Sequence, residues 1–124
     1  MVQTSPFNFG FLQEFGVPLR RFSKGDMLMK SGDPGHDMIV VLEGQLDIRI
    51  DGATTETIGI HGIAGEMALI DNAPRSATVV AATAGEVAVI DRATFLDLVR
   101  EMPAFSLFVM HALATRLRRK SGKD

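Results

Sequence analysis

Apolar residues alternate with polar ones between closely spaced turn residues throughout residues 17–90. The pattern is clearest in HDMIVVLEGQLDIRIDG, where two runs meet at Glu43-Gly44 and end at the hairpin signal Asp51-Gly52. A period of two puts every second side chain on the same face of a strand. We therefore expect a mainly β fold, with about eight short strands forming a double-stranded β-helix, or jelly-roll barrel. The side chains expected on the buried face of the two runs are Met38, Val40, Leu42, Leu46, Ile48 and Ile50.

The pattern changes to helical spacing near the C-terminus. Asp91 can cap a helix through RATFLDLVREM, and Pro103 can end that helix and open a second one through AFSLFVMHALATRLRR. The apolar surface of the second helix is wider than one contact face needs, so it either packs deeply on the barrel or also meets a ligand or a partner subunit. We expect a single domain over 1–124, with the barrel at about 17–90 and the two helices at about 91–120. The residues that widen the apolar surface are Leu107, Met110, Ala114 and Leu117.

The composition removes several classes of function. The chain has no cysteine, which excludes disulfides, thiolate metal sites, iron–sulfur clusters and cysteine catalysis. Its histidines, His36, His61 and His111, are scattered, and the sequence contains no nucleophile elbow or Walker-type loop. We therefore expect neither a metal site nor an enzymatic activity. The net charge of −2 gives no sign of nucleic-acid binding.

The N-terminal stretch MVQTSPFNFGFLQEFG lacks the basic start and apolar run of a signal peptide. The longest apolar stretches are far shorter than the roughly 20 residues that cross a bilayer. These features predict a cytoplasmic protein without a membrane span.

A short helical stretch interrupts the predicted strands at GEMALIDNAPRSA, residues 65–77. Gly65 permits close approach of a ligand, and the first amides of a short helix lack intrahelical partners and favour a negative group. The break at 72–74 lets the chain double back, so that the planar fork of Arg75 can return to the helix start and grip phosphate oxygens. Glu66 would instead accept a hydrogen bond from a sugar hydroxyl. This pattern indicates a ligand with one phosphate and one ribose; the alternative is an ordinary Glu66–Arg75 salt bridge beside a loop.

The same stretch resembles the phosphate-binding cassette of the cyclic nucleotide-binding domain family. That family includes catabolite activator-type regulators, the regulatory subunits of cyclic AMP-dependent protein kinase and cyclic nucleotide-gated channels. The cassette pattern is Gly-Glu, small and aliphatic residues, a spacer, then Pro-Arg and a small residue, and all of these stand here. Further matches are KGDMLMKSGDPG at 24–35, VLEGQLDI at 41–48 and VAVIDRATF at 87–95. The resemblance covers roughly 15–120 and implies a stand-alone cyclic nucleotide-binding domain with a jelly-roll barrel.

The resemblance implies roles for individual residues. Arg75 would bind the cyclic phosphate and Glu66 the ribose 2′-hydroxyl. A hydroxyl at Ser76 is associated with tolerance of guanine, which leaves cyclic AMP versus cyclic GMP open, with cyclic AMP favoured because the cassette is of the bacterial type. The implied ligand-binding set is Gly65, Glu66, Met67, Ala68, Arg75, Ser76 and Ala77.

The implied function is a regulatory module in which ligand binding shifts the cassette and moves the C-terminal helices. The contacts expected to carry this shift are those of Leu69, Ile70, Phe95 and Leu98, with Leu69 and Ile70 on the buried side of the short helix. Such coupling requires the ligand to prefer one of two arrangements.

Three positions depart from the family pattern. Ala64 stands where phenylalanine is usual, and Ile39 where a strand tyrosine is common. His36 occupies the place of an acid that steadies the cassette arginine, and the neighbouring Asp37 is the candidate substitute. The sequence therefore leaves the support of Arg75 open.

The partner, the oligomeric state and the residue that covers the base are also open. A homodimer through the C-terminal helix is one expectation, and direct DNA binding is not, because no helix-turn-helix motif follows residue 104. The basic stretch RLRRKSGK at 116–123 is expected to be solvated charge at a helix end. The alternatives are a degenerate module that keeps only the fold, or a fragment of a larger channel or transcription regulator. The candidates for covering the base are Phe108, Met110, His111 and Arg116.

Overall fold

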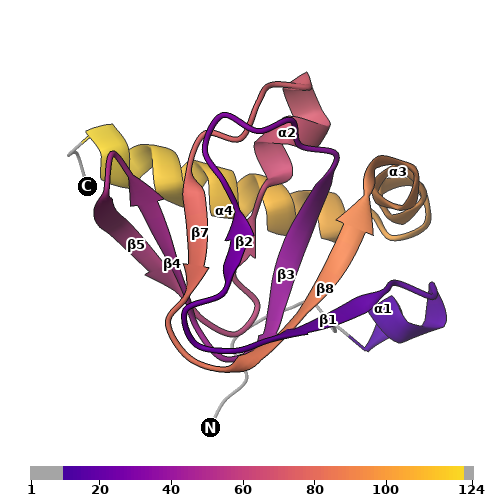
Figure 1. The fold of residues 1–124 in the computed structure, drawn as a ribbon. Helices are drawn as coiled ribbons and strands as arrows, with labels where there is room; N and C mark the ends of the chain where they lie inside the picture. Colours follow the sequence, from indigo (N-terminus) through magenta and orange to yellow (C-terminus); the bar gives the residue numbers. More distant parts are fainter. Residues whose placement is uncertain (1–9, 122–124) are drawn as a thin grey trace, which may run out of the picture.

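The computed structural model describes residues 10–121, and their strands and helices follow the order shown in Figure 1. The strands are β1 (Leu19–Phe22), β2 (Met27–Met29), β3 (Asp37–Glu43), β4 (Leu46–Ile50), β5 (Ala53–Ile58), β6 (Ile63–Ala64), β7 (Thr78–Ala81) and β8 (Gly85–Asp91). The helices are α1 (Phe11–Glu14), α2 (Glu66–Asp71), α3 (Arg92–Glu101) and α4 (Pro103–Ser121).

The strands form two antiparallel sheets that face each other. Their orders are β1-β8-β3-β6 and β2-β7-β4-β5, and apolar side chains from both sheets share one core cluster. The predicted jelly-roll fold of about eight strands is confirmed. The sheets do not close into a barrel, because among the described residues neither outer strand of the first sheet, β1 or β6, pairs with an outer strand of the second, β2 or β5.

Strand β3 is buried on both faces. Met38 and Val40 pack in the cluster that includes α3 and α4, whereas Ile39 and Val41 pack between the two sheets. All four side chains are at most 3% exposed. The alternation in the sequence predicted one buried face, which is wrong for this strand because the helices cover the face that would otherwise meet water.

Helices α3 and α4 form a layer against the sheet that contains β3 and β8 (Figure 1). Asp91 caps α3 as predicted, since its carboxylate accepts a hydrogen bond from the backbone N–H of Thr94 at 2.8 Å. Pro103 begins α4, and Phe105 is fully buried with its ring edge-on to that of Phe95, 5.9 Å between centres. Among residues 10–121, no helix combines the length and apolar character needed to cross a membrane.

Helix α2 is the short helix that the sequence predicted among the strands. Gly65 precedes it with a φ of 85°, a left-handed conformation that glycine adopts without a steric cost. Leu69 is buried against the helical layer, but Ile70 is 53% exposed. The expected burial of Ile70 is therefore wrong, because one further residue rotates the side chain about 100° around a helix and away from β3.

Candidate functional site

A cavity of about 90 Å³ lies between α2, the loop that follows it, the sheet of β2, β7, β4 and β5, and the C-terminal half of α4. All seven residues of the predicted ligand-binding set line this cavity, so the fold brings them together. The other lining residues are Met29, Ile48, Ile50, Thr55, Glu56, Ala64, Pro74, Val79 and Arg116.

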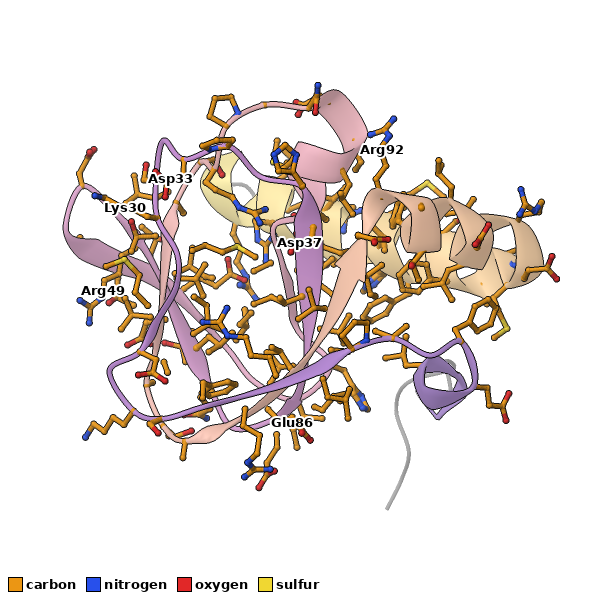
Figure 2. All side chains as sticks on the ribbon, turned by 45° about the vertical axis from the view of Figure 1, so that its right-hand side comes forward. Lys30, Asp33, Asp37, Arg49, Glu86 and Arg92 are labelled. Carbon is orange, nitrogen blue, oxygen red and sulfur yellow. The ribbon has the colours of Figure 1, made fainter. Side chains whose placement is uncertain are left out.

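The guanidinium of Arg75 is held against the start of α2. Its Nη1 donates to the backbone oxygen of Asp37 at 2.8 Å and to that of Gly65 at 3.4 Å, and its Nη2 donates to Asp37 Oδ1 at 2.7 Å. The carboxylate that supports Arg75 is therefore Asp37, and the neighbouring His36 is exposed. Figure 2 shows Asp37 on β3, at the end near α2. The side chain of Arg75 is only 9% exposed, so these bonds fix it in a largely dry environment.

Two glycines make room for the Arg75 guanidinium. A Cβ atom on Gly35 would lie 2.7 Å from three of its atoms, and one on Gly65 would lie 2.8 Å from Nη1. Real Cβ contacts are not this short, so any side chain at these positions would displace the guanidinium. The backbone of Arg75 is also fixed, because its N–H donates to Asp33 O at 2.8 Å. We call Gly35 and Gly65 the glycine cradle.

Glu66 also lines the cavity and is paired with an arginine from α4. Its side chain is 2% exposed, and Oε2 accepts from Nη1 of Arg116 at 2.7 Å. The other oxygen, Oε1, is buried and has no hydrogen-bond partner among the described residues. The alternative of a Glu66–Arg75 salt bridge is wrong, since each of the two side chains has a different ionic partner.

Arg116 joins three elements around the cavity. Besides Glu66, it contacts Glu56 on β5 through Nε at 3.0 Å and the backbone oxygen of Ile63 through Nη2 at 3.0 Å. Arg119, one turn further along α4, also reaches Glu56 at 3.3 Å. The expectation that this basic stretch is solvated is wrong for Arg116, because the carboxylates of Glu56 on β5 and Glu66 on α2 bind it. Residues 122–123 of the stretch lie outside the described residues.

The four candidates for covering the base have different positions. Arg116 lines the cavity, whereas Phe108 packs against the core beneath α3 and α4. Met110 and His111 are exposed. Arg116 is thus the candidate that the structure places at the site.

The residues expected to transmit a shift of the cassette also lie in different places. Leu69 and Leu98 belong to one buried cluster, and Phe95 packs against it. Ile70 instead lines a separate apolar groove of about 260 Å³ between α2 and α4, together with Leu113 and Leu117. Leu69, but not Ile70, therefore packs in the cluster that includes Leu98 of α3.

Sequence reasoning missed two residues of the site. Gly35 lies in the turn GDPG, and nothing in that turn shows that an arginine 40 positions later packs on it. Glu56 could have been found from the strand pattern, because it lies on the same strand face as the buried Ile58. A carboxylate on an inward face needs a hydrogen-bonding or charged partner.

The sequence profile of the family described as "Cyclic nucleotide-binding domain" matches residues 19–102, which is more than half of the chain. The chain belongs to this family. Its members are regulatory ligand-binding domains, not catalytic ones.

Among curated relatives, the domain is 38% identical to a cAMP-dependent protein kinase regulatory subunit of Eremothecium gossypii, over 59% of this chain and 16% of that protein. It is 32% identical to a cGMP-dependent protein kinase of Toxoplasma gondii, over 79% of this chain and 10% of that protein. The domain spans a fifth or less of the length of the relatives first matched.

Solved structures agree with this assignment. A cyclic nucleotide-binding domain from Methylobacillus flagellatus superposes with a TM-score of 0.76 at 28% identity, covering 88% of this chain and 66% of that one. The Thermus thermophilus catabolite activator protein also gives a TM-score of 0.76, at 27% identity, covering 91% of this chain and 58% of that one.

Proposed function

We propose that this domain binds a cyclic nucleotide in the cavity between Arg75 and Glu66 and acts as a ligand-responsive regulatory module. The observation that carries the proposal is the buried Oε1 of Glu66, which lacks a hydrogen-bond partner among the described residues. A buried acceptor without a donor is costly, and a ligand hydroxyl would supply one. Arg75, which lines the same cavity, offers a positive charge to a phosphate.

The Arg75 side chain keeps donors for an anion after its protein contacts are made. A guanidinium has five N–H groups, and the contacts to Asp37 and Gly65 use two of them at Nη1 and one at Nη2. The Nε–H and the second Nη2–H remain for two phosphate oxygens. The backbone amides of Ser76 and Ala77, which line the cavity, are the further donors that we assign to the phosphate.

The two carboxylate oxygens of Glu66 have different partners in the proposed complex, one in the protein and one in the ligand. Arg116 takes Oε2, and we assign Oε1 to the ribose 2′-hydroxyl. Because the cavity of about 90 Å³ is smaller than the roughly 300 Å³ of a typical ligand pocket, we expect α2 or α4 to shift when a nucleotide enters. The base then extends along the remaining lining, which is apolar at Ile48 and Ile50 and carries the Arg116 guanidinium, a group that stacks well on bases.

We favour cyclic AMP over cyclic GMP as the ligand. The bacterial-type cassette supports this preference, and two of the solved relatives with a TM-score of 0.76 are bacterial. The hydroxyl of Ser76 allows guanine, and curated relatives include both cAMP-dependent and cGMP-dependent kinases. Titration with both nucleotides therefore tests this preference.

We further propose a homodimer through α4. The exposed side chains Leu107, Met110 and Leu117 are 67%, 54% and 67% exposed, and with Ala114 they are spaced three and four residues apart. This spacing is the seam of a helix pair. A downstream protein in the cytoplasm would then bind the dimer in one of its two states.

Calorimetric titration of the purified chain with cyclic AMP and cyclic GMP tests the proposal. We expect saturable binding, tighter for cyclic AMP, and a weakening of about 2–5 kcal/mol in Arg75→Ala, because this change removes one member of a charged hydrogen-bonded pair. Arg49→Ala is the matched control, since Arg49 is exposed on β4 and lines none of the cavities described above. Absence of binding at millimolar concentrations of either nucleotide would favour the degenerate interaction module.

A further inference from the structure

A second cavity, of about 390 Å³, opens between β1 and β2, which are outer strands of the two different sheets. The two strands follow one another in the chain and diverge from the turn that joins them (Figure 1). Sites for small molecules usually measure about 300–1,000 Å³, so this cavity is large enough to hold one.

The inner part of the second cavity is apolar. Met29 and Ile39, which line it, are buried between the two sheets. Leu28 and Val89 also line it and pack against the same buried cluster. We call these four side chains the apolar floor. It offers hydrocarbon surface on which the apolar part of a ligand would be removed from water.

Arg20 lies on the inward face of β1, beside this floor. It is two residues from Phe22, which is buried between the sheets, and it pairs across the strands with Val87, which is also buried there. Side chains two residues apart, or directly opposite on paired strands, share one face of a sheet. The neighbouring Arg21 is on the other face, where its side chain is 70% exposed and lies near Glu86.

The second cavity carries more positive than negative charge. Lys30 and Asp33 line it from the segment between β2 and β3 (Figure 2). Neither Arg20 nor Lys30 has an ion pair within residues 10–121. Asp37 also lines the cavity, but its carboxylate is bound to Arg75 at 2.7 Å. Of the described lining residues, Asp33 alone therefore opposes two unpaired cations.

We propose that this cavity binds a small organic anion, whose acidic group meets Arg20 and Lys30 and whose apolar body lies on the apolar floor. Guanidinium and ammonium groups bind carboxylates and phosphates through charge-assisted hydrogen bonds. The site is separate from the nucleotide site, because Arg75 is the one member of the ligand-binding set named above that lines both cavities. The proposal does not depend on cyclic nucleotide binding.

The simpler alternative is that Arg20 and Lys30 only protect the open edges of the sheets. An inward-pointing charge on an outer strand prevents that strand from pairing with another molecule, and this role needs no ligand. The two explanations differ in what an added anion with an apolar chain does to the free domain.

The test is a titration of the full chain with octanoate, without nucleotide, followed through the amide chemical shifts in NMR spectra. Octanol has the same apolar chain without the charge, and acetate has the charge without the chain. The variants are Arg20→Gln and Lys30→Gln, with Arg21→Gln as the matched control on the opposite face of β1. All three side chains are exposed, so the variants should fold as the wild type does.

We expect octanoate to give saturable shifts in 19–34 and 37–39 at millimolar concentrations. Arg20→Gln and Lys30→Gln should each bind it about tenfold more weakly, as loss of one charge-assisted hydrogen bond implies, and Arg21→Gln should match the wild type. Octanol and acetate should each bind at least about tenfold more weakly than octanoate, because each lacks one of the two contacts.

Four results would overturn the inference. The first is the absence of saturable shifts, which leaves protection of the sheet edges as the role of the two cations. The second is a set of shifts confined to α2 and α4, which places octanoate in the apolar groove of Ile70. The third is an unchanged affinity in Arg20→Gln and Lys30→Gln, and the fourth is equal affinity for octanol. None of these results affects the proposed function, which the cyclic nucleotide titration tests separately.

Discussion

The glycine cradle gives the most direct test of how Arg75 is positioned. In Gly35→Ala, the new Cβ would lie 2.7 Å from Cζ, Nε and Nη1 of Arg75. The backbone of Gly35 does not adopt a positive φ, so alanine fits the chain itself without strain. The strain therefore falls on the guanidinium, which is the end of a flexible side chain and can move.

The size of the effect follows from that displacement. An ordinary contact to a Cβ is about 3.4 Å or more, so the guanidinium must retreat by several tenths of an ångström. It is held by bonds of 2.7 and 2.8 Å to Asp37, and a retreat moves its free N–H groups away from the phosphate. Loss of one charge-assisted hydrogen bond, about 1.5–3 kcal/mol, lowers the affinity for cyclic AMP roughly 10- to 100-fold.

Gly35→Ala should change the affinity for cyclic AMP but not the stability of the free domain. We expect calorimetry to show weak cyclic AMP binding by Gly35→Ala, while the melting temperature without ligand stays close to that of the wild type. Gly59→Ala is the matched control, because a Cβ at Gly59 meets no atom within 4 Å and its φ is not positive. Wild-type affinity in Gly35→Ala would refute the argument that Arg75 needs this glycine.

Three further predictions concern the core, a helix cap and the base. Phe105→Ala should lower the free energy of unfolding by about 3–5 kcal/mol in urea denaturation, because a fully buried ring is removed from the helical layer. Asp91→Ala should cost about 1 kcal/mol through loss of the α3 cap. The hydrogen bond from the Thr94 N–H lowers the pKa of Asp91 below its ordinary 3.8, so its stabilisation is present above that pH and is lost as the pH falls through the folded-state pKa; the variant should lack this acid-sensitive component in unfolding curves measured from pH 6 to pH 2. Ser76→Ala should raise the preference for cyclic AMP over cyclic GMP by about tenfold, the worth of one hydrogen bond to guanine, and an unchanged ratio would exclude contact between Ser76 and the base.

Local sequence predicted the short helix and the break after it, whereas the family resemblance identified this stretch as a phosphate-binding cassette. Gly65, α2, the break after it and the return of Arg75 all lie within 13 residues, where backbone preferences decide the path of the chain. The same holds for the cap at Asp91 and for the start of α4 at Pro103.

Contacts between residues far apart in the sequence could not be predicted from local patterns. Arg116 lies 50 residues from Glu66, and its position depends on how α4 packs across the sheet. The choice of Asp37 over His36 as the partner of Arg75 depends on the register of β3, in which Asp37 pairs with Asp91. Helix α1 and strand β6 have four and two residues, too few for a period to be seen.

Strand β3 divides the interior of the domain, and this has a consequence for how the domain can be cut. Its two faces supply side chains to separate apolar clusters, one between the sheets and one under the helices. A shortened chain that stops after β8 would expose Met38, Val40 and Ile90 to solvent as an apolar patch. We expect such a truncation to aggregate, so recombination or fusion of this domain has to carry both C-terminal helices with the strands.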